Sequence, residues 1–127
     1  MRYLLDAHAV IWYLEDSPHL SPKARSVIDN SENGIYICKF SLWEIAIKMN
    51  LDKLKLKLTF NELLNCIKMG NFDVLQIEDE HLKRLADVPF LHRDPFDRML
   101  ISTALAEGLT IITVDNDIHK YDVPWIW

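Results

Sequence analysis

In the segment Arg2-Tyr3-Leu4-Leu5-Asp6-Ala7-His8, an apolar run leads directly into an aspartate. A short apolar run of this kind predicts a buried β-strand, and the apolar residues that follow it favour a helix. Asp6 then lies at the carboxyl end of the strand, where open parallel sheets gather their ligands. The alternative is that Asp6 is only the N-cap of the following helix, a common use of aspartate. Both interpretations stay open on this segment alone.

Composition sets the class of protein. The chain has 127 residues, of which 50% are hydrophobic and 26% charged, so we expect a single domain over residues 1–127 with a sizeable core. The formal net charge of -5 neither indicates nor excludes nucleic-acid binding, since local patches decide that. Cys38 and Cys66 lack metal-ligand spacing and are expected to be buried free thiols. With no signal pattern and no membrane-spanning apolar run, we expect a soluble cytoplasmic protein with no membrane partner.

Strand-like and helix-like segments alternate along the whole chain. The predicted strands are residues 3–5, 35–38, 72–77 and 109–114, and helices are predicted between and after them. Such alternation indicates an α/β fold in three layers, with a central, mainly parallel sheet flanked by helices. The alternating lysines and leucines of residues 53–58 favour an extended, half-buried segment. The apolar tail of residues 123–127 is expected to pack on the domain or on a second subunit.

This architecture brings four acids to one edge of the sheet. Asp6 and Asp115 follow strands, and Glu44 and Asp97 are expected in the first turns of helices whose N-termini lie at the same edge. Each acid also has a purely structural interpretation. Ser41 and Glu44 match a capping box, Asp94 and Asp97 match a helix start, and Asp115 suits a turn. Convergence of all four favours a functional site.

Clustered carboxylates repel one another unless a cation lies between them. Oxygen ligands without thiolates or clustered imidazoles favour Mg²⁺ or Mn²⁺, and such a site activates water for attack on phosphorus. The candidate catalytic and metal-binding residues are therefore Asp6, Glu44, Asp97 and Asp115. His8 and His92 are the only histidines expected near this edge, and we interpret both as hydrogen-bonded structural residues.

Several motifs carry a resemblance to a known family. They are Leu4-Leu5-Asp6-x-His8, Ser41-x-Trp43-Glu44-Ile45-Ala46-Ile47-Lys48, Asp94-Pro95-Phe96-Asp97-Arg98-Met99-Leu100-Ile101, Thr113-x-Asp115 and the closing Trp127. Over its full length the chain resembles the PIN domain and, more narrowly, the VapC toxins of bacterial toxin–antitoxin pairs. The resemblance implies a Mg²⁺-dependent endoribonuclease, a homodimer and a cognate antitoxin, with the family's acids on Asp6, Glu44, Asp97 and Asp115. Ala7 departs from the family, which usually has a hydroxyl residue there.

Other functions remain open at this point. An aspartyl-phosphate phosphatase normally has a second aspartate two positions after the first, where this chain has His8. A signalling receiver domain needs adjacent acids near the first strand, and this chain offers one. A degenerate PIN-like module would bind a partner without catalysis. Contact with an RNA substrate has weak support from basic residues that could form a rim around the acids, namely Lys48, Lys53, Lys55, Lys57, Arg93 and Arg98. Lys55 and Lys57 fit solvated surface lysines better, whereas Lys48 and Arg98 closely follow Glu44 and Asp97.

Overall fold

The central element of the fold is a parallel β-sheet. A computed structural model describes residues 1–127 and contains a five-stranded sheet in the order β3-β2-β1-β4-β5. The strands are β1 (Arg2–Leu5), β2 (Gly34–Cys38), β3 (Asp73–Leu75), β4 (Thr110–Ile112) and β5 (Trp125–Ile126). Every pairing is parallel, and Leu5 at the end of β1 lies between Ile37 and Ile112. All strands therefore end at the same edge, as the α/β prediction requires.

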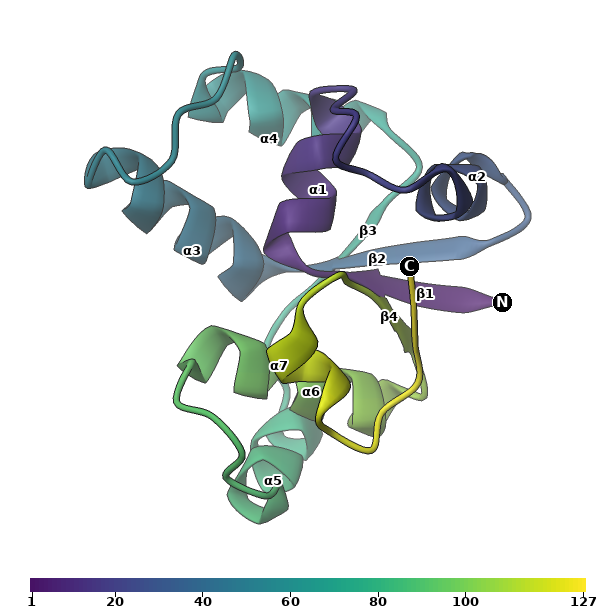
Figure 1. The fold of residues 1–127 in the computed structure, drawn as a ribbon, viewed down its shortest axis with the longest axis vertical. Coiled ribbons are helices and arrows are strands. Elements are labelled where there is room, and N and C mark those ends of the chain that lie inside the picture. Colours follow the sequence, from purple (N-terminus) through teal and green to yellow (C-terminus); the bar gives the residue numbers. More distant parts are fainter.

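Helices cover both faces of the sheet. They are α1 (Ala7–Leu14), α2 (Pro22–Asp29), α3 (Lys39–Asn50), α4 (Phe60–Met69), α5 (Asp79–Asp87), α6 (Pro95–Glu107) and α7 (Asn116–His119). Figure 1 shows α1 to α4 on one side of the sheet and α5 to α7 on the other. Side chains alternate along β1, so Leu5 belongs to the core under α1 to α4 and Leu4 to the core under α5 to α7. The predicted three-layer arrangement is confirmed.

Local signals in the sequence set several helix ends. The Ser21 hydroxyl accepts the Ala24 N–H at 3.0 Å, directly before Pro22. Thr59 and Glu62 form a reciprocal capping box at the start of α4. Gly108 ends α6 with a φ of 67°, a left-handed conformation that suits glycine. None of the helices is long and apolar enough to cross a membrane.

Three expectations need correction. Helix α3 begins at Lys39, directly after β2, and its N-cap Cys38 makes no side-chain capping bond. Ser41 and Glu44 therefore lie inside the helix, and the predicted Ser41–Glu44 capping box does not form. The predicted strand over residues 109–114 is shorter, which leaves Thr113 and Val114 between β4 and Asp115. Cys38 is buried as expected, but Cys66 is exposed on the outer face of α4.

The C-terminal tail forms part of the sheet. The Ile111 N–H donates to Pro124 O at 2.9 Å and the Thr113 N–H to Ile126 O at 3.2 Å, which adds β5 as an edge strand. The expectation that the tail packs on the domain is therefore confirmed. Residues 53–58 belong to no strand, yet their leucines are half-buried and their lysines exposed, as the alternation predicted.

Candidate functional site

Asp6 lies at the end of β1 and is only 6% exposed. Its Oδ1 accepts the Ala9 N–H at 2.8 Å, which makes it the N-cap of α1, and its Oδ2 accepts the Thr113 hydroxyl at 2.6 Å. Asp6 is therefore the N-cap of α1, and it lies at the sheet edge where the sequence placed it. Burial raises the pKa of Asp6, and the hydrogen bonds from Thr113 and Ala9 act in the opposite direction.

Thr113 links two of the predicted acids. Its side chain is fully buried, and its Oγ1 accepts the Asp115 N–H at 3.0 Å while donating to Asp6. Asp115 in turn caps α7, with Oδ1 accepting the Asp117 N–H at 2.8 Å. The sequence motif Thr113-x-Asp115 was noted, but the role of the hydroxyl was missed. His119 was overlooked too, since its Nε2 lies 2.9 Å from the Thr113 carbonyl oxygen at this same edge.

Glu44 projects from the interior of α3 and is 7% exposed. Its Oε2 pairs with Lys48 Nζ at 2.8 Å, one helical turn further on. Partial burial lowers the pKa of Lys48, but the hydrogen bond to Glu44 and the nearby charges of Glu44, Asp94 and Asp97 raise it overall. Lys48 is thus a cation held among the acids, as its position after Glu44 suggested.

Asp97 lies in the first turn of α6, three residues after the cap. Asp94 Oδ1 accepts the N–H groups of Phe96 at 2.9 Å and Asp97 at 3.2 Å, so Asp94 is the N-cap that the sequence predicted. The Asp97 side chain is 17% exposed. Burial raises its pKa to about 8, with further increases from the negative charges of Asp94, Asp115, Glu44 and Asp6.

The structure therefore brings the four predicted acids into one electrostatic neighbourhood around Asp97. They come from the end of β1, from α3, from the start of α6 and from the loop between β4 and α7. Figure 1 shows these segments meeting at one edge of the sheet, between the two helical layers. Residues spread over the length of the chain meet there because parallel strands all end on the same side.

The four acids have the chemistry of a site for a hard cation, but their side chains do not surround a position for one ion. No three His, Cys, Asp or Glu side chains lie close enough together to hold one ion as they stand. Instead, Glu44 is paired with Lys48, and the two oxygens of Asp6 accept hydrogen bonds from Thr113 and Ala9. The residues fit Mg²⁺ or Mn²⁺ by donor type, since all are carboxylates. For several of these carboxylates to bind one ion, their side chains must rotate, first of all that of Glu44.

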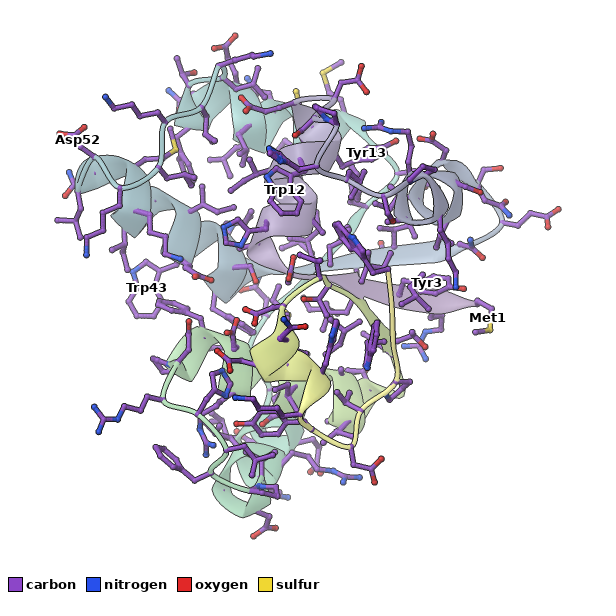
Figure 2. The ribbon with its side chains drawn as sticks, viewed as in Figure 1. Met1, Tyr3, Trp12, Tyr13, Trp43 and Asp52 are labelled. Carbon is purple, nitrogen blue, oxygen red and sulfur yellow. The ribbon has the colours of Figure 1, made fainter.

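The predicted basic rim is only partly at the acids. Arg98 does not face them, because its Nη1 donates to Pro89 O at 3.0 Å and its guanidinium lies 4.6 Å from the centre of the Phe90 ring. Lys53, Lys55 and Lys57 come after α3 in the chain, beyond Asp52, which Figure 2 labels at the far end of that helix. Trp43, beside Glu44, is 62% exposed and meets Phe96 edge-on, with ring centroids 5.4 Å apart.

Comparisons with known proteins give a consistent result. The model of the PIN domain family matches residues 3–124. Among solved structures, VapBC2 from Rickettsia felis bound to a promoter DNA fragment matches with a TM-score of 0.74 at 16% identity, over 99% of this chain and 98% of that one. FitAcB from Neisseria gonorrhoeae shares the fold with a TM-score of 0.69 at 18% identity, over 98% of this chain and 96% of that one. VapBC-1 from nontypeable Haemophilus influenzae also has a TM-score of 0.69, at 15% identity over 99% of this chain and 97% of that one. No curated protein matches the sequence.

Proposed function

Because the chain belongs to the PIN domain family, we propose that it is a divalent-metal-dependent endoribonuclease that acts as the toxin of a toxin–antitoxin pair. One observation carries the proposal: the fold brings Asp6, Glu44, Asp97 and Asp115 from distant parts of the chain to one edge of the sheet, where the negative charges of the other three raise the pKa of Asp97 further above the value that burial gives it. If these acids served only as helix caps, they would not need to lie close enough to repel one another. The same pattern supports a bound cation in the working protein.

The chemistry follows from the residues at this edge. Asp6, Glu44, Asp97 and Asp115 are proposed to hold Mg²⁺ or Mn²⁺, which when bound lowers the pKa of a coordinated water and stabilises charge on the phosphate. Thr113 keeps Asp6 fixed through its 2.6 Å hydrogen bond. Lys48 leaves Glu44 and becomes free to contact a phosphate oxygen of the RNA. Ala7 supplies no hydroxyl beside Asp6, so we expect weaker metal binding than a hydroxyl residue would give.

The partners proposed are an RNA substrate, a cognate antitoxin and a second copy of the chain, in the cytoplasm. The matched structures VapBC2, FitAcB and VapBC-1 support an antitoxin partner, as does a toxin–antitoxin complex from Klebsiella pneumoniae that shares the fold. The surface also offers large exposed apolar side chains, including Trp43, Phe90 and Leu91. An antitoxin that inserts a basic side chain among the acids would neutralise them and block the site.

The rival phosphoryl-transfer functions have less support. An aspartyl-phosphate phosphatase has a second aspartate two positions after the first, where this chain has His8, and a receiver has adjacent acids near its first strand, where this chain has only Asp6. A catalytically degenerate PIN module remains the main alternative, and it differs from the proposed enzyme by binding RNA or a partner without cleavage.

The test is cleavage of mixed cellular RNA, with mapping of the new ends. We expect cleavage with Mg²⁺ or Mn²⁺, none after chelation, and none for Asp97→Asn. Asp73→Asn is the matched control, because Asp73 is exposed at the opposite, amino end of a strand. Activity that survives exhaustive chelation would overturn the metal mechanism, and RNA binding without cleavage at any metal concentration would favour the degenerate module.

A further inference from the structure

Asp97 has a partner that the proposed metal chemistry does not use. His92, in the loop before α6, places its Nε2 3.3 Å from Asp97 Oδ2. The other ring nitrogen, Nδ1, lies 2.8 Å from the hydroxyl of Tyr121, which follows α7. His92 is 10% and Tyr121 is 6% exposed, and their ring centroids are 5.4 Å apart. The two rings thus form a buried connection from the C-terminal segment to the acidic edge.

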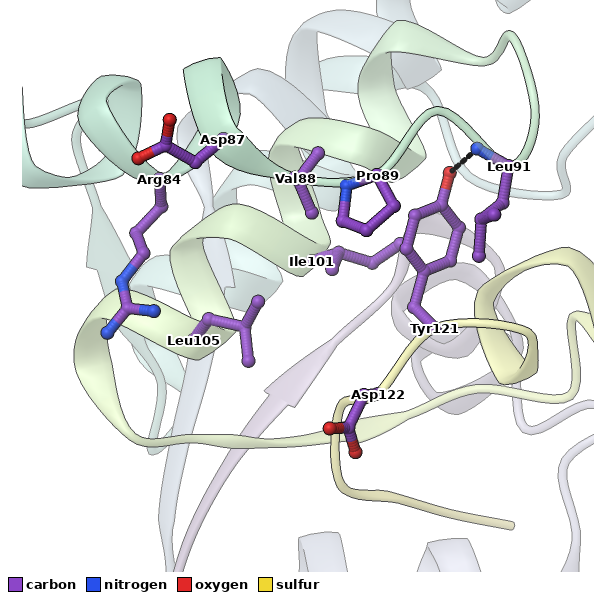
Figure 3. A pocket seen from close by; sticks show the side chains of 9 residues that line it. All are labelled: Arg84, Asp87, Val88, Pro89, Leu91, Ile101, Leu105, Tyr121 and Asp122. Carbon is purple, nitrogen blue, oxygen red and sulfur yellow. Dashed lines mark hydrogen bonds between the residues drawn. The ribbon is translucent and has the colours of Figure 1, made fainter.

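Counting donors and acceptors fixes the direction of these bonds. The Tyr121 oxygen accepts the Leu91 N–H at 3.3 Å, drawn as a dashed line in Figure 3, and an Arg98 guanidinium N–H at 3.4 Å. Backbone amides and guanidinium groups donate only, so the hydroxyl hydrogen of Tyr121 remains for His92 Nδ1. Because Nδ1 accepts, the neutral imidazole carries its hydrogen on Nε2, which faces Asp97 Oδ2.

This arrangement has a consequence for a cation at the acidic edge. With its hydrogen aimed at Asp97, Nε2 has no lone pair for a metal, so His92 does not act as a ligand. The bond instead occupies Asp97 Oδ2 and fixes the plane of the carboxylate, while Oδ1 stays free of protein hydrogen bonds. Carboxylates that bind metals are commonly oriented by an outer hydrogen-bonding partner in this way.

We propose that Tyr121 and His92 are positioning residues that hold the Asp97 carboxylate in the orientation for binding a divalent cation. This inference rests on the proposed function, because it assigns Asp97 to a metal. Tyr121 suits the role because it is 6% exposed and its hydroxyl is held by the Leu91 N–H and the Arg98 guanidinium. The ring also forms one wall of a hollow of about 320 Å³ that Val88, Pro89, Ile101 and Leu105 help to line (Figure 3).

The first experiment needs neither RNA nor metal. A long-range ¹H–¹⁵N NMR spectrum of the wild-type protein reports which ring nitrogen of His92 carries hydrogen. We expect Nε2–H in the wild type and a shift towards Nδ1–H in Tyr121→Phe, which lacks the hydroxyl that donates to Nδ1. A hydrogen on Nδ1 in the wild type would overturn the assigned direction of the bonds and the proposal with it.

The second experiment measures Mn²⁺ affinity by calorimetry. The amide nitrogen of glutamine lies near the place of Nε2, whereas that of asparagine lies near Nδ1. We therefore expect His92→Asn to weaken Mn²⁺ binding by about 10- to 100-fold and His92→Gln to restore most of the affinity. His19→Asn is the control, since His19 is exposed on the Trp12 ring and has no contact with the acids. Equal affinity in all variants, or equal loss in both His92 variants, would overturn the proposal.

The two experiments separate this inference from the proposed nuclease. A protein that shows the expected NMR and Mn²⁺ results but cuts no RNA would retain the positioning role and lose the proposed function. A protein that cuts RNA with metal, but whose Mn²⁺ affinity is unchanged by substitution of His92, would retain the proposed function and lose the positioning role. A wild-type protein that binds no Mn²⁺ would overturn both.

Discussion

The Thr113 hydroxyl donates a 2.6 Å hydrogen bond to Asp6 Oδ2, although the two residues are 107 positions apart in the chain. They follow the neighbouring parallel strands β4 and β1, whose register pairs Leu5 with Ile112. The bond fixes an aspartate oxygen at the sheet edge without burying an unpaired charge, and the same hydroxyl oxygen receives the Asp115 N–H. Thr113 thus fixes two of the proposed ligands relative to each other.

Replacing Thr113 with valine tests this link. Thr113→Val keeps the shape of the side chain but leaves Asp6 Oδ2 and the Asp115 N–H without their partner in a buried site. We expect a loss of about 1–3 kcal/mol of unfolding free energy and weaker Mn²⁺ binding. Thr113→Ser retains the hydroxyl and is expected to lose less of both. Equal stability and affinity for the valine and serine variants, measured by denaturation and calorimetry, would contradict the link.

The stability of the metal-free protein is expected to depend on Asp97 ionisation. The pKa of Asp97 is raised to about 8 in the folded chain, against an ordinary value of 3.8. Between these values the folded state binds more protons than the unfolded state, so the contribution of Asp97 is present at low pH and is lost as pH rises through about 8. The slope is at most about 1.4 kcal/mol per pH unit for one proton. Asp6, whose pKa is also raised, acts in the same direction.

The measurement compares wild type with Asp97→Asn in denaturant at several pH values between about 6 and 8. Wild type should lose stability relative to the variant as pH rises, and saturating Mg²⁺ should remove that difference in slope. Parallel stability curves without metal would show that Asp97 is ionised throughout this range.

Lys48 is expected to compete with the cation for Glu44. Lys48→Met keeps the aliphatic stem but removes the ammonium group that lies 2.8 Å from Glu44 Oε2. We expect Mn²⁺ affinity to rise by about tenfold, equivalent to about 1.4 kcal/mol. Lys83→Met is the matched control, because Lys83 pairs with Glu80 on the exposed surface of α5. Weaker Mn²⁺ binding by Lys48→Met would show that Lys48 supports the site instead.

Much of this site follows from residues that can be read locally. An apolar run ending in Asp6 predicts the strand and its edge, and Asp94-Pro95 predicts the start of α6. Glu44 was predicted in a first turn, but β2 runs directly into α3 without a polar cap, so the true helix start left no signal. The role of Thr113 depends on strand register, and that of Tyr121 on a contact with His92 across 29 residues. Neither is visible in a local pattern.

The pairing of the C-terminal tail with the sheet is likewise not visible in a local sequence pattern. Residues 125–126 follow Pro124 and are too few to give a recognisable strand pattern. Their composition correctly predicted packing on the domain. Their pairing with β4 depends on main-chain hydrogen bonds, one of them to the carbonyl oxygen of Pro124, and the types of side chain give no signal of such bonds.

Expression in a host without the partner is expected to arrest growth, and co-expression of a small cognate antitoxin is expected to relieve the arrest. The basis is the PIN family membership together with the toxin–antitoxin structures that share the fold. Asp97→Asn should be harmless at equal expression, measured by growth curves and blotting. Unimpaired growth with folded wild-type protein that binds Mn²⁺ would contradict the toxin role.

Asp94 and Asp97 lie at the same helix start and are expected to behave differently. Asp94 Oδ1 accepts the Phe96 and Asp97 N–H groups, and an asparagine there retains a capping oxygen. Asp94→Asn should therefore change the unfolding free energy by less than about 1 kcal/mol and leave most of the cleavage activity. Asp97 makes no cap and is buried among other acids, so Asp97→Asn removes a proposed ligand and relieves repulsion.

Asp97→Asn should abolish metal-dependent cleavage while the metal-free protein stays as stable or becomes more so. The measurements are the cleavage rate and the thermal midpoint of both variants, each with and without Mg²⁺. Addition of Mg²⁺ should raise the midpoint of Asp94→Asn, because a cation that binds only the folded state stabilises it, and should leave Asp97→Asn nearly unchanged. An inactive Asp94→Asn beside an active Asp97→Asn would exchange their roles, making Asp94 the ligand and Asp97 a residue of the helix start.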